Sequence, residues 1–388
     1  MMSEKKVPAI RFRGFEDDWE QRKLSDLVDV CSGMDYKHLS IGNIPVFGTG
    51  GYMLSVDKAL SYDRDAIGIG RKGTIDKPYI LKAPFWTVDT LFYCIPRDEG
   101  TLNFDYDLFQ CIDWKQKDES TGVPSLSKVA INDTDVIVPK TEEQKKIGYF
   151  FEELDLVITL HQCKLEKLKI VKKSMLVNCF PKNGEKVPKF RFSGFTGDWE
   201  QRKLSDIYKD IGNAFVGTAT PYYVEEGHFY LESNNIKDGL INHNTEVFIN
   251  DVFYENQKDK WLHTGDMVMV QSGHVGHAAV IPKELDCSAA HALIMFRNPK
   301  VEIEPYFLNY QYQTAKSKKK IENITTGNTI KHILASEMQE FIVDVTSYGE
   351  QKKIAGFFRD LDNLITLHQR ELKKLQMIKK SMLRSMFV

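Results

Sequence analysis

A glycine-rich segment, Gly68-Ile-Gly-Arg-Lys-Gly73, is the first place in this chain where residue types and spacing could support chemistry. The pattern GxGxxG cradles the pyrophosphate of a dinucleotide when a strand precedes it and a helix follows. Here Pro78 and β-forming residues follow, which argues against a helix. We therefore predict a tight turn that presents cations to phosphates or base edges, with these candidate DNA-binding residues: Arg71, Lys72, Thr74 and Lys77. A dinucleotide-binding loop and a solvated turn remain the alternatives.

A second polar turn, Gln271-Ser-Gly-His-Val-Gly-His277, follows the apolar run Asp266–Val270. Its glycines allow the backbone to approach a ligand closely. Its side chains offer donors and acceptors to base edges, so the candidates here are Gln271, Ser272, His274 and His277. The two histidines could instead bind a metal together with His291, but no third ligand at suitable spacing is evident, and we expect no metal site.

Glycine-polar segments occur twice more, at Ser120–Ser125 and Thr325–Lys331. A basic cluster at Lys316 and Lys318–Lys320 is either a solvated helix face or a phosphate contact. From these segments and from nearby polar residues we select as further DNA-binding candidates Ser125, Asn234, Asn235, Lys237, Asn328, Thr329 and Lys331.

Two stretches of the chain occur twice, and they define the elements that must hold these turns. Val7–Leu27 returns as Val187–Ile207 with 15 of 21 residues identical, at a shift of 180 residues. Glu143–Leu176 returns as Glu350–Leu383 with 22 of 34 identical, at a shift of 207 residues. The two regions between the repeats differ in length by 27 residues and show no obvious similarity. The duplication predicts a repeated frame that carries two different recognition regions.

Each long repeat has the heptad spacing of a coiled-coil helix. We expect the two helices to run antiparallel and to pair along seams formed by Phe151, Leu154, Ile158, His161, Leu165 and Leu168 in the first copy, and by Phe358, Leu361, Ile365, His368, Leu372 and Leu375 in the second. The two histidines either fix the register of the pair or form a catalytic or metal pair. Thr141 and Ser347 lie where the helices should begin. The negatively charged glutamates after them should interact favourably with the positive end of the helix dipole.

The regions between the repeats contain short apolar runs bounded by glycine and proline, which predict strands, whereas residues 305–324 predict helix. The expected class is α+β, with two mixed α/β recognition domains separated by two long antiparallel coiled-coil helices in a pseudo-twofold internal repeat. The chain starts with a short repeat and ends with a long one. The first short repeat should therefore pack on the C-terminal helix, as the second packs on the central helix. The segment Leu154–Leu176 of the first helix would span roughly 34 Å, about one turn of B-form DNA.

Composition excludes several classes of protein. The net charge of −2 gives no overall nucleic-acid signal, so any such binding must come from local basic surfaces. The six cysteines form no CxxC pair, which favours free thiols in a reducing compartment. No apolar run is long enough to span a bilayer and no signal-peptide core is evident, so we expect a cytoplasmic protein. The sequence has no GxxxxGK[ST] loop and no convincing catalytic triad, so we expect a protein without catalytic activity.

The duplicated GF..DWEQRKLSD segment, the duplicated EQKKI helix and the turns GIGRKGTI and TGNTIKHI together resemble the specificity subunits of type I restriction-modification systems. The resemblance covers essentially the whole chain. It implies that each recognition domain reads one half of an asymmetric, bipartite DNA target. It also implies that the helices set the gap between the halves and dock two modification subunits, which carry S-adenosylmethionine and methylate adenine at N6. Two motor-nuclease subunits, which use ATP and Mg²⁺, would complete the restriction enzyme; this chain itself would bind no cofactor.

Carried onto this chain, the resemblance implies six segments: a conserved N-terminal segment at 1–27, target-recognition domains at 28–142 and 208–349, a central spacer helix at 143–183, a repeat of the N-terminal segment at 184–207, and a C-terminal spacer helix at 350–388. Two other functions remain open from the residues alone. One is a coiled-coil scaffold with two protein-binding domains, which would show no salt-dependent DNA affinity. The other is a dinucleotide-dependent enzyme, which would bind NAD or a flavin tightly.

Overall fold

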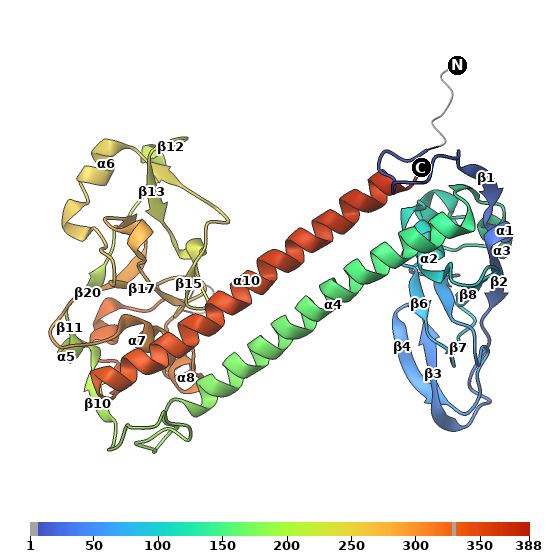
Figure 1. The fold of residues 1–388 in the computed structure, drawn as a ribbon. Helices are drawn as coiled ribbons and strands as arrows, with labels where there is room; N and C mark the ends of the chain where they lie inside the picture. Colours follow the sequence, from blue (N-terminus) through green and yellow to red (C-terminus); the bar gives the residue numbers. More distant parts are fainter. Residues whose placement is uncertain (1–6, 328–330) are drawn as a thin grey trace. The chain divides into compact units, whose positions relative to one another are not determined.

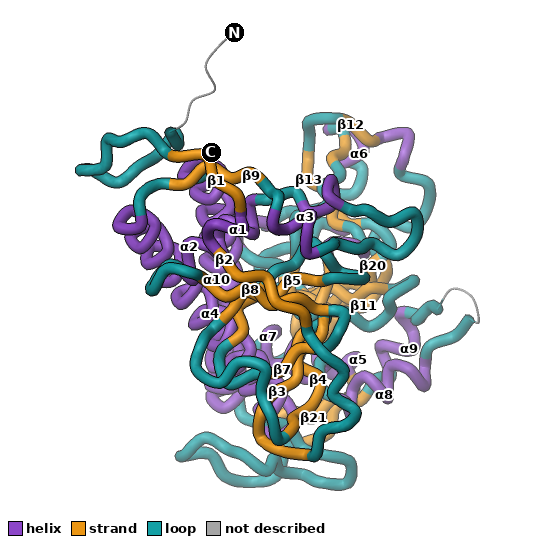
Figure 2. Tube along the Cα trace, turned by 90° about the vertical axis from the view of Figure 1, so that its right-hand side faces the viewer, coloured by secondary structure: helices purple, strands orange, loops and turns teal. Residues whose placement is uncertain are grey.

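The computed structural model describes residues 7–327 and 331–388, which belong to two compact units (Figure 1). The first unit combines the chain up to Cys163 with His368–Val388, and the second is the continuous segment Lys164–Leu367. Both units mix strands and helices (Figure 2), which confirms the predicted α+β class. Among the described residues, no helix is both long enough and apolar enough to cross a membrane.

The first unit is built around an antiparallel sheet whose strands lie in the order β2 (Val28–Ser32), β8 (Leu91–Pro96), β5 (Ala66–Gly70) and β6 (Tyr79–Leu81). A second sheet has the order β4 (Gly51–Val56), β3 (Ile41–Gly48) and β7 (Trp86–Thr87), and a separate pair is formed by β1 (Glu20–Lys23) and β9 (Asp135–Val138). The helices are α1 (Leu24–Leu27), α2 (Leu102–Cys111), η1 (Trp114–Lys117), α3 (Lys128–Asn132), the first part of α4 (Thr141–Asn178) and the last part of α10 (Tyr348–Met386).

The second unit has a matching antiparallel sheet in the order β11 (Tyr208–Asn213), β20 (Leu293–Pro299), β17 (Met267–Val270) and β18 (Ala278–Val280). Its second sheet has the order β12 (Tyr223–Val224), β16 (Phe248–Ile249), β13 (His228–Leu231) and β19 (Ala289–Ala290). Two further pairs are β10 (Glu200–Lys203) with β21 (Ile342–Val345) and β14 (Ile236–Lys237) with β15 (Leu240–Ile241). The helices are α5 (Leu204–Ile207), η2 (Thr220–Tyr222), η3 (Ser233–Asn235), α6 (Asp251–Glu255), η4 (Lys258–Lys260), η5 (Lys283–Leu285), α7 (Pro305–Tyr312), α8 (Ala315–Ile324) and α9 (Ala335–Gln339), with the remaining parts of α4 and α10.

The two units share one internal plan although their recognition regions lack sequence similarity. In the first sheet Ile67 pairs with Cys94, and in the second Met267 pairs with Phe296. Ile67 and its equivalent Met267 are therefore 200 positions apart, and Cys94 and Phe296 are 202 apart, whereas equivalent residues of the short repeats are 180 apart. Twenty of the 27 additional residues accordingly lie between Ile207 and Met267, where the second unit has α6 and most of its second sheet. A ladder requires only apolar, strand-compatible side chains, so the plan persists without identity.

A phenylalanine just beyond α10 completes the core of the first unit. The ring of Phe387 is 8% exposed, and its centroid lies 6.4 Å from Trp19, 5.4 Å from Phe104 and 6.1 Å from Phe151. These three partners belong to the N-terminal segment, to α2 and to α4. One ring therefore joins both repeats to the recognition region.

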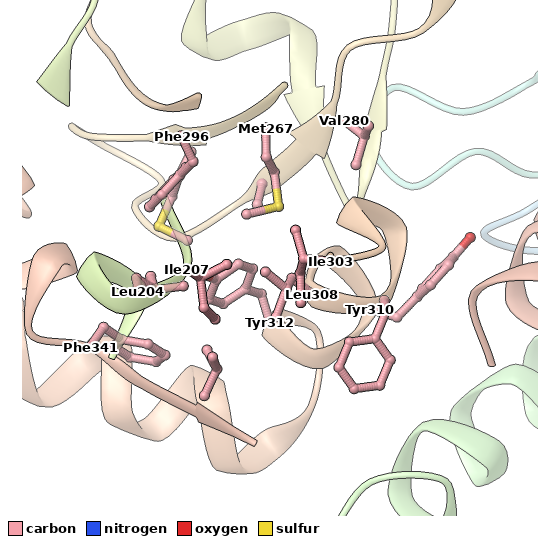
Figure 3. Close-up of a cluster of buried hydrophobic side chains, with 14 of the residues drawn as sticks. Leu204, Ile207, Met267, Val280, Phe296, Ile303, Leu308, Tyr310, Tyr312 and Phe341 are labelled. Atoms are coloured by element: carbon pink, nitrogen blue, oxygen red, sulfur yellow. The ribbon is translucent and has the colours of Figure 1, made fainter. Parts of the chain in front are cut away.

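The second unit repeats this arrangement with Phe180, which follows the end of α4. Its ring centroid lies 6.0 Å from Trp199, 5.5 Å from Phe307 and 6.2 Å from Phe358. The same core continues between the sheet and the short helices, where Leu204 and Ile207 of α5 meet strand and helix residues, as Figure 3 shows. Both copies of the short repeat thus pack on the end of a long helix.

Matching backbone hydrogen bonds fix the ends of the two long helices. The Ile10 N–H donates to the carbonyl of Ser385 at 2.9 Å in the first unit. The Phe190 N–H donates to the carbonyl of Asn178 at 2.8 Å in the second. These residues are equivalent in the two repeats, and each bond satisfies a carbonyl in the last turn of a helix, where no intrahelical donor is available.

Within the first unit, α4 and α10 pair in antiparallel orientation. Lys379 Nζ lies 2.7 Å from a carboxylate oxygen of Asp155, and the Nδ1 atoms of His161 and His368 are 3.1 Å apart. The second unit contains the equivalent ion pair, Lys172 with Asp362, at 2.6 Å. The seam residues of the sequence analysis are all buried or half-buried in the structure, namely Phe151, Leu154, Ile158, His161, Leu165 and Leu168, and Phe358, Leu361, Ile365, His368, Leu372 and Leu375.

A buried arginine–glutamate pair anchors each short repeat to the start of a long helix. Arg11 donates two hydrogen bonds to Glu143 at 2.7 and 2.8 Å, and Arg191 donates two to Glu350, both at 2.8 Å. The hydrogen bonds to Glu143 raise the pKa of Arg11 above its usual value. From sequence alone, these glutamates are expected only to interact with the helix dipole. The structure shows that their larger role is to receive a guanidinium in a site where the Glu143 side chain is only 1% exposed.

We expect Arg11→Ala to destabilise the first unit by ~3–5 kcal/mol, because it leaves the buried Glu143 carboxylate without its cation. Urea unfolding followed by near-ultraviolet circular dichroism measures this change. Arg22→Ala is the matched control, since it removes an arginine of the same segment whose ion pair with Glu20 is exposed, and should leave stability nearly unchanged. Equal effects of the two substitutions would contradict the structural role of the buried pair.

Candidate nucleic-acid interface

The turn after β5 presents two exposed cations at the end of a hairpin. Residues 71–78 connect β5 to β6, which pair as an antiparallel hairpin. A strand therefore follows the GxGxxG segment, and the helix that a dinucleotide-binding loop requires is replaced by β6. Arg71 and Lys72 are exposed. The Arg71 guanidinium makes a long contact, 3.4 Å, to the carbonyl of Asp89 and lies over the Phe92 ring, 5.8 Å from its centroid.

The backbone conformation at one position and the lack of space at another explain why this turn contains glycines. A bound nucleotide is not needed to account for them. Gly73 has φ of +90°, which L side chains rarely adopt. A Cβ on Gly70 would lie 2.0 Å from the carbonyl oxygen of Thr74, so only glycine fits there. Thr74 is half-buried inside the turn, whereas Lys77 is exposed.

The structure brings Ser125 to the same turn. The Gly73 N–H donates to the carbonyl of Pro124 at 2.8 Å, and the Leu126 N–H donates to the carbonyl of Arg71 at 3.0 Å. These bonds join the glycine turn to the segment before α3. The result is a shallow cavity of about 320 Å³ whose lining includes Arg71, Lys72, Phe92, Ser125, Ser127 and Lys128.

The second unit makes the same connection with different residues. The Gly273 N–H donates to the carbonyl of Lys331 at 3.0 Å, and the Ile333 N–H donates to the carbonyl of Gln271 at 3.0 Å. Ser272 forms a bridge with His332, just as Lys72 does with Ser125. Lys331 is exposed at this junction, while the predicted residues Asn328 and Thr329 lie outside the described part of the chain.

A larger cavity, about 460 Å³, lies beside the second turn and is lined by residues that include Asp238, His274, His277, Lys318 and Lys331. His274 Nε2 donates to the carbonyl of Ser233 at 2.9 Å. The Asp238 N–H donates to His277 Nδ1 at 3.2 Å, which leaves that nitrogen unprotonated. Burial lowers the pKa of His277, so its ring is neutral at neutral pH and can present a hydrogen-bonding group without a charge.

Hydrogen bonds inside the domain already involve all three histidines considered for a metal. His291 lies 3.4 Å from Glu232 and donates to the carbonyl of Gly217 at 2.9 Å. Its hydrogen bond to Glu232 raises the pKa of His291, and the same bond lowers the pKa of Glu232. Both ring nitrogens of His291 thus face partners within the domain, Glu232 and Gly217.

The remaining candidates divide between exposed and structural positions. Asn234 and Lys237 are exposed. Asn235 is 2% exposed, and its amide donates to the carbonyls of Asn242 and Thr245 at 3.1 and 2.8 Å. The prediction for Asn235 therefore needs correction, because its side chain holds a loop together and has no free group to offer to a base.

The basic cluster of α8 is also partly structural. Lys316 pairs with Asp344 at 2.6 Å and is 13% exposed. Lys320 donates to the carbonyl of Ile342, and burial lowers its pKa. Lys318 and Lys319 are exposed, so these two retain the ability to contact phosphate.

Sequence reasoning missed Lys128 beside the first turn and Lys318 as a neighbour of Lys331 in the second cavity. Both residues come from helices that are distant in sequence from the glycine turns. The only sequence signal for these neighbours was the polar segment before each long repeat. In the structure, Ser125 and His332, in and beside those segments, form backbone bridges with the two glycine turns.

Comparisons with known proteins show which family model and which other proteins the chain resembles. A family model described as the type I restriction modification DNA specificity domain matches it twice, at residues 16–169 and 196–377. The type I restriction enzyme MjaVIII specificity subunit of Methanocaldococcus jannaschii is 23% identical over 330 residues, which are 82% of this chain and 74% of that protein. The putative type I restriction enzyme MjaX specificity subunit of the same organism is 23% identical over 264 residues, which are 67% of this chain and 60% of that protein.

The fold also has a solved counterpart. The crystal structure of the S subunit of a type I restriction-modification system from M. genitalium aligns over 98% of this chain and 99% of its own length. The TM-score is 0.71 at 15% sequence identity, so the likeness establishes a shared fold.

We expect Gly70→Ala to destabilise the first unit by ~1–3 kcal/mol, because the added methyl group must displace the carbonyl of Thr74. Thermal unfolding measures the effect. Gly122→Ala is the control from the neighbouring segment, since a Cβ there has no atom within 4 Å and Gly122 does not have a positive φ. An unchanged melting temperature for Gly70→Ala would show that the turn is not held as described.

Proposed function

Because the chain belongs to the type I restriction modification DNA specificity family, its role is to give a restriction-modification enzyme its DNA specificity, and we propose that each of its two units recognises one half of a bipartite, asymmetric target. The chain supplies recognition, and the chemistry on DNA belongs to partner subunits.

One observation supports this proposal most strongly. The two units join a glycine turn to the segment before a long repeat by the same hydrogen bonds, yet they place different side chains at equivalent positions. Arg71 corresponds to Gln271, Lys72 to Ser272, and Ser125 to His332. A common backbone with divergent polar side chains is the arrangement expected of two domains that approach DNA alike and read different bases.

The chemistry of these side chains suggests which bases they select. An arginine binds the O6 and N7 atoms of guanine through two hydrogen bonds, and a glutamine pairs similarly with N6 and N7 of adenine. Arg71 is exposed, so its guanidinium can reach a base edge. Gln271 has a buried Oε1 without a hydrogen-bond partner among the described residues, and rotation of its amide toward DNA would supply one.

Other candidates suit contacts that carry no sequence information. Lys72 and Lys128 beside the first turn, and Lys318 and Lys331 beside the second, are exposed cations close to the proposed reading positions. Such residues neutralise phosphates and fix the register of a protein on the duplex. We assign the exposed candidates Lys77 and Lys237 to the same role, and Asn234 to an uncharged hydrogen bond with the DNA backbone.

The long helices supply a docking surface for modification subunits in this proposal. The seam residues are turned inward, so a partner would use other faces of the helices. The first unit exposes Val157, Leu160, Met377 and Ile378, and the second exposes the equivalent residues Leu364, Leu367, Ile170 and Val171. Exposed apolar residues of this kind mark interaction surfaces. Their equivalence favours two copies of one partner.

The partners would carry the cofactors. We infer that two modification subunits bind S-adenosylmethionine and methylate adenine at N6, and that two motor-nuclease subunits use ATP and Mg²⁺. We further propose that the assembly acts on cytoplasmic DNA. No cofactor role is assigned to the cavities of this chain.

We expect Arg71→Ala, in a complex with the modification subunit, to weaken binding of the cognate target by ~1–3 kcal/mol and to relax one base pair in one half. Binding to a panel of targets altered in each half measures this. Lys72→Ala serves as the control, because loss of a phosphate contact weakens all targets alike and reduces the salt dependence. A uniform loss for Arg71→Ala would reassign Arg71 to the phosphate backbone.

We expect insertion of seven residues into both α4 and α10, beside His161 and His368, to widen the unspecified gap by about three base pairs while both halves stay the same. One heptad preserves the seam, so helix pairing should survive. Mapping methylated adenines in a genome that expresses the variant with its partner reads out the target. A changed half-site would count against the proposal that the helices set only the spacing.

A further inference from the structure

Three side chains that are distant from the proposed DNA-reading turns meet on the surface of the second unit. His263 lies in the turn before β17, and Asp286 and Cys287 lie between η5 and β19. One ligand-type atom from each of the three residues lies within 4.8 Å of the others. The sequence gives no hint of this group, because 23 residues separate the histidine from the aspartate and no CxxC pair is present.

The separations are close to the edges of a metal-binding tetrahedron, with a different oxygen of Asp286 facing each of the other two ligands. His263 Nδ1 is 3.6 Å from Asp286 Oδ1 and 3.8 Å from Cys287 Sγ, and Cys287 Sγ is 3.5 Å from Asp286 Oδ2. Zinc bonds to sulfur at about 2.3 Å and to nitrogen or oxygen at about 2.0–2.2 Å, which gives tetrahedral edges of about 3.3–3.6 Å. Each observed separation is within a few tenths of an ångström of that range.

The surroundings hold these ligands in place. The Thr264 N–H and hydroxyl both donate to Asp286 Oδ1, at 2.7 and 3.1 Å, which orients the carboxylate and leaves Oδ2 toward the thiol. Cys287 has φ of +64°, an uncommon backbone conformation for a residue other than glycine, and its carbonyl accepts a hydrogen bond from Tyr254 at 2.8 Å.

We propose that His263, Asp286 and Cys287 form a binding site for a zinc-class divalent cation. A thiolate, an imidazole and a carboxylate suit a borderline-soft ion, whereas Mg²⁺ and Ca²⁺ take oxygen ligands. The fourth position faces solvent, since the His263 and Asp286 side chains are 60% and 47% exposed, so water completes the tetrahedron. Binding releases the thiol proton to solvent as the sulfur–metal bond forms.

The proposed ion would connect two loops that a short backbone bridge already joins. Leu262 and Ser288 exchange two hydrogen bonds, at 2.9 and 3.2 Å, immediately beside the three ligands. These bonds join the segment before β17 to the residue before β19, and therefore connect the segments that lead into the two four-stranded sheets of the second unit. A cation bound only by the folded arrangement stabilises that unit.

Cobalt titration of the full-length chain, freed of metal and kept reduced by a phosphine, tests the site. We expect one equivalent of Co²⁺ to give a thiolate-to-cobalt charge-transfer band and the intense visible bands of tetrahedral cobalt, and Zn²⁺ to displace it. Cys287→Ser should abolish the thiolate band and weaken affinity by about 10-fold or more. Zn²⁺ should raise the melting temperature of the wild-type chain and not that of Cys287→Ser.

Two controls separate this site from other thiols and histidines. Cys163→Ser removes an exposed thiol on α4, and His243→Asn removes an exposed histidine paired with Glu246. Both variants should retain the band and the stabilisation. Matching circular dichroism of Cys287→Ser and wild type verifies that the fold is intact. A wild-type chain without a thiolate band, or a band that survives in Cys287→Ser, would refute the proposal.

Discussion

Burial of a single phenylalanine ring holds each unit of this protein together. Phe387 and Phe180 each follow the end of a long helix, and each touches a tryptophan of a short repeat, the first turns of the opposite long helix and a phenylalanine of the recognition region. Removal of a buried phenylalanine side chain typically costs ~3–5 kcal/mol. In each unit this ring packs against both the duplicated segments and the recognition region, and it therefore joins them in one hydrophobic core.

This constraint leaves the recognition regions free to diverge elsewhere. Phe104 and Phe307 supply the contact on the recognition side, and the central four-stranded sheet keeps one strand order in both units. Most of the additional length in the second unit lies between β11 and β17, away from that contact. Sequence can thus change at the turns and in the second sheet while the frame, with its buried arginine–glutamate pairs, remains the same.

The features that the sequence predicts well are local ones. Heptad spacing predicted α4 and α10, apolar runs predicted the central strands, and the helical interpretation of residues 305–324 holds with one break between α7 and α8. The errors concern contacts between distant residues. The burial of Asn235 could not be inferred, because its bonding partners lie 7 and 10 residues away in an irregular loop. Arg11, which pairs with Glu143, lies 132 residues away in the sequence, so the residues around Glu143 indicated only the start of a helix.

The discontinuity of the first unit affects the order in which the chain can fold during synthesis. The second unit is one uninterrupted segment and can close once Leu367 has left the ribosome, whereas the first lacks Phe387 until 20 more residues have emerged. Vectorial synthesis normally favours the N-terminal domain, yet here the later segment finishes first. The nascent first unit carries an open aromatic site throughout that interval. It is therefore the part of the molecule most exposed to chaperones, proteolysis and misassembly.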